Sequence, residues 1–198
     1  MTTSHVRVVL ESSPALDALD ALDALERAVA SVAGVRPDQV VIDSSCDDCG
    51  RPHGKPRVSS PRAPDGSEIV VSKSSAGGLV AIAVSSDAAG RDLGVDVESR
   101  TSVSRARVDE VAFSDAERDL IDDEPAETRA LLRTRLWSRK EAYLKATGRG
   151  LRLDLTTVDL ASGSAADAVI VDVPVNDPDL VLSVVMLGTE PVIVDPIE

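Results

Sequence analysis

The sequence of 198 residues predicts an α+β fold. Two long helical segments are separated by several strand-like runs, whereas in a doubly wound sheet helices and strands alternate one for one. A division near residue 90 leaves one long helix and about three strands on each side of it. We therefore expect two α/β domains, residues 1–90 and 91–198, that form one compact unit.

The N-terminal half is expected to begin with a strand followed by a helix. The β-branched, apolar run Val6–Leu10 predicts the strand. Ser12–Pro14 is typical of a helix start, and the helix is expected over Ala15–Val32. Residues 43–68 are rich in glycine and proline, which predicts an ordered loop. Two strands joined by a glycine turn are expected at Ile69–Ser72 and Leu79–Ser85.

The C-terminal half is expected to open with the strand Leu93–Glu98, in which apolar residues alternate with glycine and acids. Ser114 and Glu117 have the spacing of a helix capping box. A second long helix is predicted over Pro125–Ala146, and it ends near Gly148. The remaining strand-like runs are Val158–Ala161, Ala168–Val173 and Leu180–Leu187.

Composition argues against several classes of protein. A net charge of −13 disfavours nucleic acid and anionic membranes as partners, because both would repel the chain. The longest uncharged stretch, Ser74–Ser86, is shorter than the roughly 20 apolar residues of a membrane-spanning helix. Two cysteines build no disulfide framework, and the first residues contain no apolar signal segment. A cytoplasmic location is therefore the default expectation.

Three carboxylates form the first candidate site. Asp96 and Glu98 lie on one face of the predicted strand Leu93–Glu98, and Glu141 lies on the second long helix. Residues i and i+2 of a strand point to the same side, about 7 Å apart. Repulsion between such acids is relieved by protonation, by solvent or by a cation, and three oxygen ligands suit Mg²⁺. The alternative is that Asp96 and Glu98 face solvent on an edge strand.

Basic residues favour an anionic ligand near these acids. Trp137, Glu141 and Lys145 are spaced by four and share one helix face. Lys145 is then expected beside a phosphate, or it forms only a surface ion pair with Glu141. The stretches 51–73 and 129–152 contain all four lysines and 13 of the 21 cations. We expect an anion between these stretches; the alternative is a solvated basic surface.

Cys46, Cys49 and His53 form a C-x₂-C-x₃-H run. Zinc binds such residue types, but a structural zinc site has four ligands and the sequence contains no further cysteine. His5 is the only other histidine. A packed, reduced cysteine pair is the favoured interpretation, and metal binding is the alternative.

Two segments, GVDVE at Gly94–Glu98 and WSRKEAYLK at Trp137–Lys145, together resemble the 4′-phosphopantetheinyl transferases of the surfactin-synthetase-activating (Sfp) type. Asp96 and Trp137 are 41 residues apart, as in the paired motifs of that family. The similarity spans residues 46–155. Its further elements are Gly54–Pro56 (G-K-P), Phe113–Glu117 (F-S-x-x-E) and Gly148–Leu151 (G-R-G-L).

The resemblance implies an enzyme that moves the phosphopantetheine arm of coenzyme A onto a serine hydroxyl of an acyl, polyketide or peptidyl carrier protein and releases 3′,5′-ADP. It implies a monomer of two similar α/β halves, related by a pseudo-twofold, with the site at their interface. The implied ligands of Mg²⁺ are Asp96, Glu98 and Glu141, and the implied catalytic residues are Asp96, Glu141 and Lys145. The residues implied in binding coenzyme A are Lys55, Pro56, Ser72, Lys73, Lys140 and Lys145.

The chain departs from the family at two places. The family usually has Ser-His-Ser where Ser72–Ser74 is Ser-Lys-Ser, although lysine still offers a cation to phosphate. The first helix is acidic, whereas the family carries basic residues there that help to bind the 3′-phosphate of coenzyme A. In this chain, the alternative partners of that phosphate are Arg51, Arg57 and Arg62. A non-catalytic protein that binds coenzyme A or a nucleotide is therefore the alternative function. An unrelated Mg²⁺-dependent phosphohydrolase is disfavoured by the paired motifs.

Overall fold

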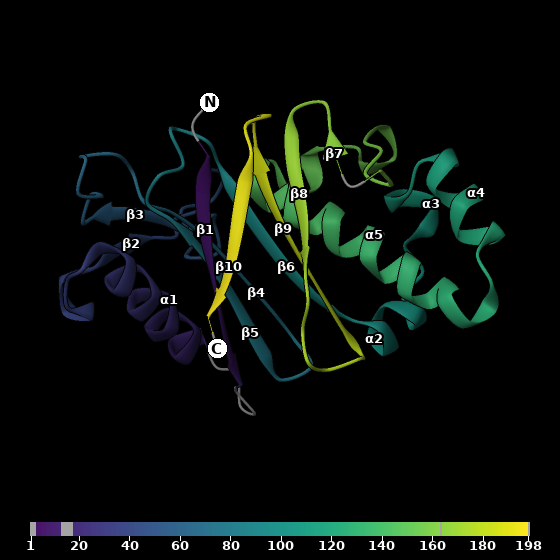
Figure 1. The fold of residues 1–198 in the computed structure, drawn as a ribbon, viewed down its shortest axis with the longest axis horizontal. Helices are drawn as coiled ribbons and strands as arrows, with labels where there is room; N and C mark the ends of the chain where they lie inside the picture. The colour runs from purple at the N-terminus through teal and green to yellow at the C-terminus, as the bar shows by residue number, and fades with distance from the viewer. Residues whose placement is uncertain (1–2, 13–17, 163, 198) are drawn as a thin grey trace.

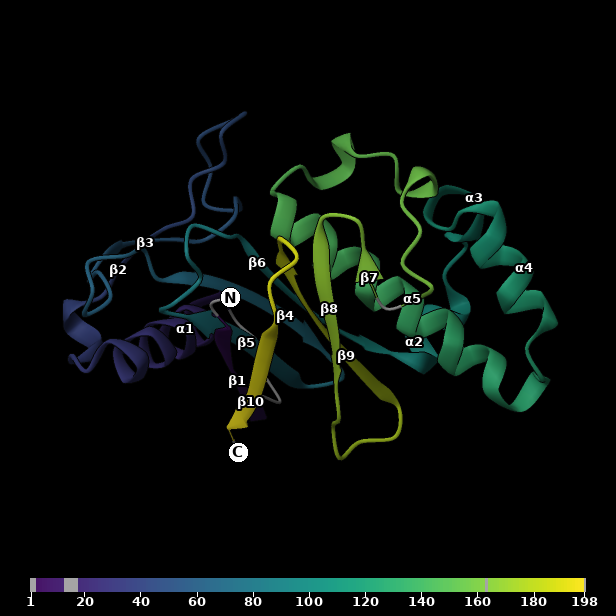
Figure 2. The same ribbon diagram turned by 45° about the horizontal axis from the view of Figure 1, so that its top comes forward.

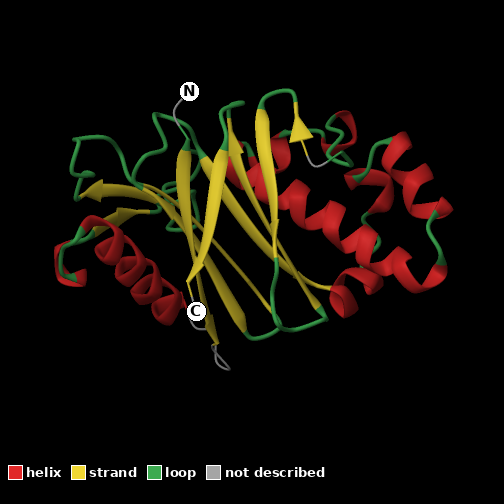
Figure 3. Ribbon diagram, in the orientation of Figure 1, coloured by secondary structure: helices red, strands yellow, loops and turns green. Residues whose placement is uncertain are grey.

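The computed structural model describes residues 3–12, 18–162 and 164–197, and it has an α+β architecture built around two four-stranded sheets (Figures 1 and 3). The first sheet has the order β10-β1-β5-β4, with β1 (Ser4–Ser12), β4 (Val70–Ala76), β5 (Leu79–Ser85) and β10 (Val192–Ile197). The second has the order β6-β9-β8-β7, with β6 (Leu93–Ser99), β7 (Ser164–Ala165), β8 (Ala168–Val173) and β9 (Leu180–Leu187). A separate ribbon pairs β2 (Val41–Asp43) with β3 (Arg57–Ser60).

Two long helices and several short ones complete the described part of the chain. The long helices are α1 (Ala18–Ala33) and α5 (Ala126–Thr147). The short α-helices are α2 (Arg100–Arg105), α3 (Asp109–Ala112) and α4 (Asp115–Asp123). The 3-10 turns are η1 (Pro37–Gln39), η2 (Gly150–Arg152) and η3 (Leu155–Thr157). None of the helices in the described residues is long and apolar enough to cross a membrane.

The sheets pack face to face, and each carries one long helix on its other face (Figure 1). In β5, Val80, Ile82 and Val84 pack toward α1, whereas Ala81 and Ala83 pack between the sheets. This alternation follows from the two-residue period of a strand. The small alanines let the two sheets approach closely over the central core.

Local rules explain the boundaries of α4 and α5. The Ser114 hydroxyl accepts a hydrogen bond from the Glu117 amide, and the Glu117 carboxylate accepts one from the Ser114 amide, so the predicted capping box is confirmed. Helix α5 ends at Gly148, whose φ of 65° is left-handed and suits glycine. The predicted second helix is therefore confirmed to within one residue at each end.

Three expectations are corrected. Val158–Ala161 is not a strand, because the Val158 carbonyl accepts from the Lys140 ammonium and the Leu160 amide donates to the Glu117 carboxylate. The loop 43–68 contains β3. Strand β10 was not predicted, and it pairs in parallel with β1 at the opposite end of the chain. The expected start of the first helix, at residues 13–17, lies outside the described residues.

The division near residue 90 falls between β5 and β6. From the second part, β10 joins the first sheet beside β1. The relation of the two halves by a pseudo-twofold, and the split into residues 1–90 and 91–198, stay predictions.

Helix α5 lies unusually close to β6 because Gly94 has no side chain. A Cβ at Gly94 would lie 1.9 Å from the Ala142 carbonyl oxygen and 2.6 Å from the Ala146 amide nitrogen. Both are backbone atoms, which cannot move away by rotation of a side chain. Gly94 therefore sets the distance between the strand that carries Asp96 and the helix that carries Glu141.

A buried ion pair joins α4 to α5. The Lys140 ammonium lies 2.6 Å from the Glu117 carboxylate, and both side chains are 0% exposed. Lys140 also donates to the carbonyls of Leu155 and Val158, and Glu117 accepts from the Leu160 amide. The pair is thus satisfied on all sides, as a buried pair must be if it is not to destabilise the fold.

We expect Gly94→Ala to destabilise the fold by about 1–3 kcal/mol or more, because α5 must move away from β6. Gly90→Ala is the comparison: its Cβ faces open space, so only its φ of +78° opposes alanine, at about 1–2 kcal/mol. Chemical denaturation measures both losses. An equal or smaller loss at Gly94 would contradict the close packing.

Lys140→Met is expected to cost about 3–5 kcal/mol, because it leaves the Glu117 carboxylate buried without a cation. Glu117→Gln in the same chain should recover part of that loss, since the amide keeps an acceptor oxygen without the charge. A double-mutant cycle by urea denaturation measures the coupling. Additive losses from the two substitutions would show that the pair is not coupled.

Candidate active site

The three predicted carboxylates come together where β6 packs against α5. Asp96 and Glu98 point from β6 to the face that α5 covers, and Glu141 lies on α5. Asp96 and Glu141 are close enough for their charges to act on each other and on Glu98. The alternative that Asp96 faces solvent is wrong, because the residue is only 2% exposed.

Asp96 is held by groups from three elements. Its Oδ1 accepts from the Lys145 ammonium on α5 at 2.7 Å and from the Ser74 hydroxyl on β4 at 2.8 Å. Its backbone carbonyl accepts from the buried Ser138 hydroxyl. Burial raises the pKa of the Asp96 carboxyl, although Lys145 and the hydroxyls act in the opposite direction. Asp96 Oδ2 is buried and has no hydrogen-bond partner.

Glu98 and Glu141 have raised pKa values. Burial and the charges of Asp96 and Glu141 raise the pKa of Glu98 to about 7, although the Trp137 indole donates to its carboxylate at 3.0 Å. Burial, and after it the charge of Asp96, raises the pKa of Glu141. Trp137, Glu141 and Lys145 thus face β6 together, as their four-residue spacing predicts. Two acids whose pKa values are raised by burial and by neighbouring carboxylates favour binding of a cation beside them.

The donor set fits a hard divalent cation. Asp96 Oδ2 is a buried oxygen without a partner, and the charge of Asp96 acts on two further carboxylates, Glu98 and Glu141. All these ligand atoms are oxygens, as Mg²⁺ prefers. The acids are less tightly grouped than Cys46, Cys49 and His53, whose ligand atoms lie within 4.8 Å of one another. A cation at the acids would therefore keep part of its coordination for water or phosphate.

A cleft of about 780 Å³ opens beside the acids. Glu141 and Lys145 on α5 line it, and so do the predicted residues Lys55, Pro56, Ser72 and Lys73. Arg149, which belongs to the G-R-G-L element, and Arg152, which lies outside the quoted motifs, add two further cations. Cations from both basic stretches therefore meet in one cleft, as their distribution in the sequence predicts.

Lys55 is fixed at the edge of this cleft. Its ammonium donates to the Asp92 carboxylate at 2.6 Å and to the Ala146 carbonyl at 2.7 Å, and its side chain is 18% exposed. Burial lowers the pKa of Lys55, while Asp92 counteracts that effect. The lysine of the G-K-P motif is thus tied to the end of α5.

The Ser-Lys-Ser segment of β4 connects the two sheets. The buried Ser72 hydroxyl accepts from the Val95 amide at 3.0 Å, so β4 is tied to the free edge of β6. The Ser74 hydroxyl joins Lys145 to Asp96. Ser74 was not predicted as a site residue, although it lies two residues from Ser72 on the same strand face.

Lys140 does not belong to the cleft, and its predicted role in binding coenzyme A is corrected. Its side chain is fully buried, is paired with Glu117 and donates to the Leu155 carbonyl. Burial lowers the pKa of Lys140, and Glu117 counteracts that effect. An ammonium without exposed surface cannot contact a phosphate.

Many of the remaining cations are paired at the surface or between elements. Arg133 pairs with Asp109, Arg139 with Asp172 and Arg152 with Asp48. Two of the three arginines considered as partners of a 3′-phosphate are likewise engaged: Arg57 with Asp47 and Arg62 with Glu68. The basic stretch 129–152 is therefore not a uniformly solvated patch.

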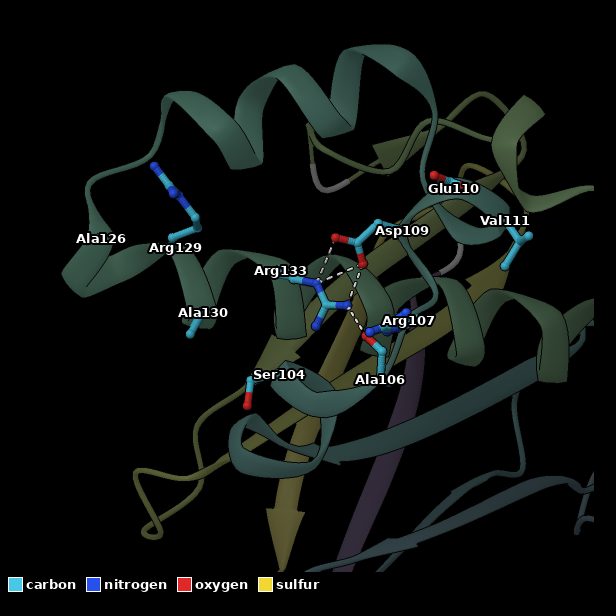
Figure 4. Close-up of a pocket in the computed structure, with 10 residues that line it drawn as sticks. All are labelled: Ser104, Ala106, Arg107, Asp109, Glu110, Val111, Ala126, Arg129, Ala130 and Arg133. Carbon is cyan, nitrogen blue, oxygen red and sulfur yellow. Dashed lines mark hydrogen bonds and ion pairs between the residues drawn. The ribbon is translucent and has the colours of Figure 1, made fainter.

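A second cavity of about 730 Å³ lies between α2, α3 and the first half of α5 (Figure 4). Figure 4 shows the Arg133 guanidinium turned toward the Asp109 carboxylate, to which it donates. Arg133 also donates to the carbonyls of Val103 and Ala106. Its charge is thus already satisfied, so we assign the chemistry to the cleft beside the three carboxylates.

Comparison with known proteins gives a match to a family model and similarity to a solved structure. Residues 92–173 match the model of the 4′-phosphopantetheinyl transferase superfamily. No curated protein sequence matches the chain. Among solved structures, the holo-ACP-synthase from Plasmodium yoelii is similar at 11% identity, over 51% of this chain and 99% of its own, with a TM-score of 0.38.

The family match covers β6, α5 and β8, the elements that carry Asp96, Glu98 and Glu141 or support them. It also contains both motifs on which the resemblance in the sequence depends. Over residues 92–173, the chain is therefore similar to the 4′-phosphopantetheinyl transferase superfamily.

Proposed function

We propose that the protein transfers the 4′-phosphopantetheine arm of coenzyme A to a serine hydroxyl of a carrier protein, as Sfp-type enzymes do. One observation carries the proposal: a buried, partnerless oxygen of Asp96 lies beside Glu98 and Glu141, next to a cleft lined by lysines and arginines. The cleft offers cations for the phosphates of coenzyme A, and the acids offer ligands for a cation on its pyrophosphate.

In the proposed reaction, the serine oxygen forms a bond to the phosphorus that bears the pantetheine arm. The bridging P–O bond of the pyrophosphate breaks, and 3′,5′-ADP leaves. Glu141 lines the cleft and accepts the serine proton, directly or through water. Attack on a pyrophosphate depends mainly on positioning and on neutralised charge.

Mg²⁺ bound by Asp96, Glu98 and Glu141 would neutralise charge on the pyrophosphate. Lys145 holds Asp96 in place and lines the cleft, so its ammonium is placed to contact a phosphate there. Lys55 and Pro56 border the nucleotide, and Lys73 faces its phosphates from β4. Lys73 replaces the histidine of related enzymes with a permanent point charge.

The two-halves interpretation is part of this proposal. The cleft is lined from both predicted domains, 1–90 and 91–198, and β4 contacts β6 across the division through Ser72. We propose that the halves are related by a pseudo-twofold and that the protein acts as a cytoplasmic monomer. An acyl, polyketide or peptidyl carrier protein would approach the open side of the cleft.

The second candidate function is a protein that binds coenzyme A or a nucleotide without transferring the arm. It is favoured by α1, whose Arg27 is paired with Glu11 on β1. Helix α1 also lies on the other side of the first sheet from β6 (Figure 2). This helix therefore lacks the basic residues that would bind the 3′-phosphate of coenzyme A.

Incubation of the full chain with coenzyme A, Mg²⁺ and apo carrier proteins from fatty-acid, polyketide and peptide synthesis tests transfer. We expect mass spectrometry to show at least one carrier gaining the mass of the arm. Glu141→Gln should slow transfer by about 100-fold or more, because ligand and base are lost together. Glu127→Gln, on the exposed first turn of α5, is the matched control and should transfer at the wild-type rate.

Two outcomes would count against this assignment. Binding of coenzyme A without any mass gain across the carriers would support the second candidate function. A wild-type rate in Glu141→Gln would remove Glu141 from the chemistry. Circular dichroism of both variants separates loss of function from loss of fold.

The raised pKa of Glu98 predicts a pH-dependent stability. Its folded value of about 7 lies above the ordinary 4.5, so the folded state binds this proton more tightly than the unfolded state. The stabilising contribution is complete below pH 4.5 and is lost as the pH rises through about 7. Without added metal, Tm should therefore fall over this range, and it should fall less in Glu98→Gln.

Thermal unfolding in the presence of a chelator, measured at several pH values, gives the slopes. Glu127→Gln serves again as the control and should keep the wild-type slope. Parallel curves for the wild type and Glu98→Gln would show that Glu98 titrates normally. Added Mg²⁺ should flatten the wild-type curve, since it favours the ionised carboxylates.

A further inference from the structure

A second cluster of metal-ligating side chains lies in the loop between β2 and β3, which projects from the sheets in Figure 2. The ligand atoms of Cys46, Cys49 and His53 all lie within 4.8 Å of one another. The Cys49 sulfur is 3.0 Å from His53 Nε2. Tetrahedral zinc has ligand bonds of about 2.0–2.3 Å, which place its ligand atoms about 3.3–3.8 Å apart. The separations in the loop, from 3.0 Å to no more than 4.8 Å, include that range.

The backbone of this loop already has a closed shape. The Cys46 amide donates to the Arg51 carbonyl at 2.8 Å, and the Gly50 amide donates to the Cys46 carbonyl at 2.8 Å. Gly50 has a φ of +70°, which glycine adopts without strain. The Gly54 amide donates to the Ser44 carbonyl. These bonds bring both ends of the C-x₂-C-x₃-H run together without help from a metal.

Gly54 is required for this closure. A Cβ at this position would lie 2.5 Å from the Ser45 carbonyl oxygen. The chain therefore passes itself at a distance that only glycine permits. Gly54 also begins the G-K-P motif, so the loop that holds the cysteines leads directly into Lys55.

The backbone of the loop turns toward the Cys46 sulfur. The amides of Asp48 and Cys49 donate hydrogen bonds to it. These amides orient the first sulfur of the C-x₂-C turn toward the other two side chains of the cluster, whose ligand atoms lie within 4.8 Å of it.

The cluster lies at the wall of the cleft already described. Cys46 and His53 line that cleft together with Lys55 and Arg152, and Cys49 is exposed to solvent. Three side chains leave one position of a tetrahedral ion open. The open position therefore has access to water or to an anion in the cleft.

We propose that Cys46, Cys49 and His53 bind one zinc ion whose fourth ligand is a water molecule or an anion from the cleft. Two thiolates and an imidazole are ligands that zinc prefers, whereas Mg²⁺ prefers oxygen. The ion joins the two ends of the loop and fixes the segment that leads into Lys55. Two thiol protons are released to solvent when it binds. This inference does not depend on the proposed transfer reaction.

Metal content tests the proposal. The full chain is purified without chelators or affinity metals from cells grown with added zinc, and metals are measured by inductively coupled plasma mass spectrometry. We expect one zinc per chain in the wild type. Cys49→Ser and His53→Gln should lose it, whereas Asp47→Asn, a non-ligand in the same loop, should keep it.

A cobalt titration of the metal-free protein gives a second measurement. Thiolate-to-cobalt charge-transfer absorption and strong d–d bands are expected in the wild type, and they should be absent in Cys49→Ser. Glu141→Gln should keep both zinc and cobalt binding, which separates this site from the carboxylates. Circular dichroism establishes that each variant is folded.

Two results would overturn the proposal. One is a folded wild type that retains no zinc and gives no thiolate absorption with cobalt. The other is zinc retained at one per chain in Cys49→Ser. A Cys46–Cys49 disulfide in freshly purified protein, found by mass spectrometry after alkylation, would replace the zinc site with a redox pair.

Discussion

The site depends on the close packing of α5 against β6. Gly94 lets the helix backbone approach the strand more closely than any side chain would permit. Because of this approach, Glu141 and Lys145 on the helix meet Asp96 and Glu98 on the strand. The same packing places the Trp137 indole on Glu98 and the Ser138 hydroxyl on the Asp96 backbone. A single small residue thus controls where the reactive side chains of two elements lie.

The burial of carboxylates is the second constraint, and the structure contains two different arrangements around them. Around Glu117 the buried acid is satisfied by an ammonium and by two amides. Around Asp96 one carboxylate oxygen is satisfied and the other has no partner. The first arrangement is complete, so removal of either partner would leave a buried charge unpaired. The second is incomplete, which is typical of a position that binds a ligand or an ion.

The loop between β2 and β3 extends the functional region beyond the superfamily match. That match covers residues 92–173, whereas the cysteines, the G-K-P motif and the Ser-Lys-Ser strand lie before it. These N-terminal residues line the same cleft as Glu141 and Lys145. The cleft therefore combines an oxygen-rich donor set at its acidic end with a sulfur and nitrogen donor set at its wall. A hard cation such as Mg²⁺ would prefer the oxygen donors, and a softer cation such as zinc would prefer the sulfur and nitrogen donors.

Sequence alone determined the α+β class, most strands, the capping box, the end of α5 and the grouping of three acids with nearby cations. These features depend on local period, turn chemistry and spacing, which a linear pattern contains. Tertiary structure alone decided that Lys140 is buried on Glu117 while Lys145 lines the cleft, although both lie in one motif on one helix. It also decided that β10 pairs with β1 and that residues 158–161 form no strand. The burial of a side chain and the pairing of a strand depend on residues that are distant in the sequence. A local pattern does not contain these residues, because only the folded chain brings them into contact.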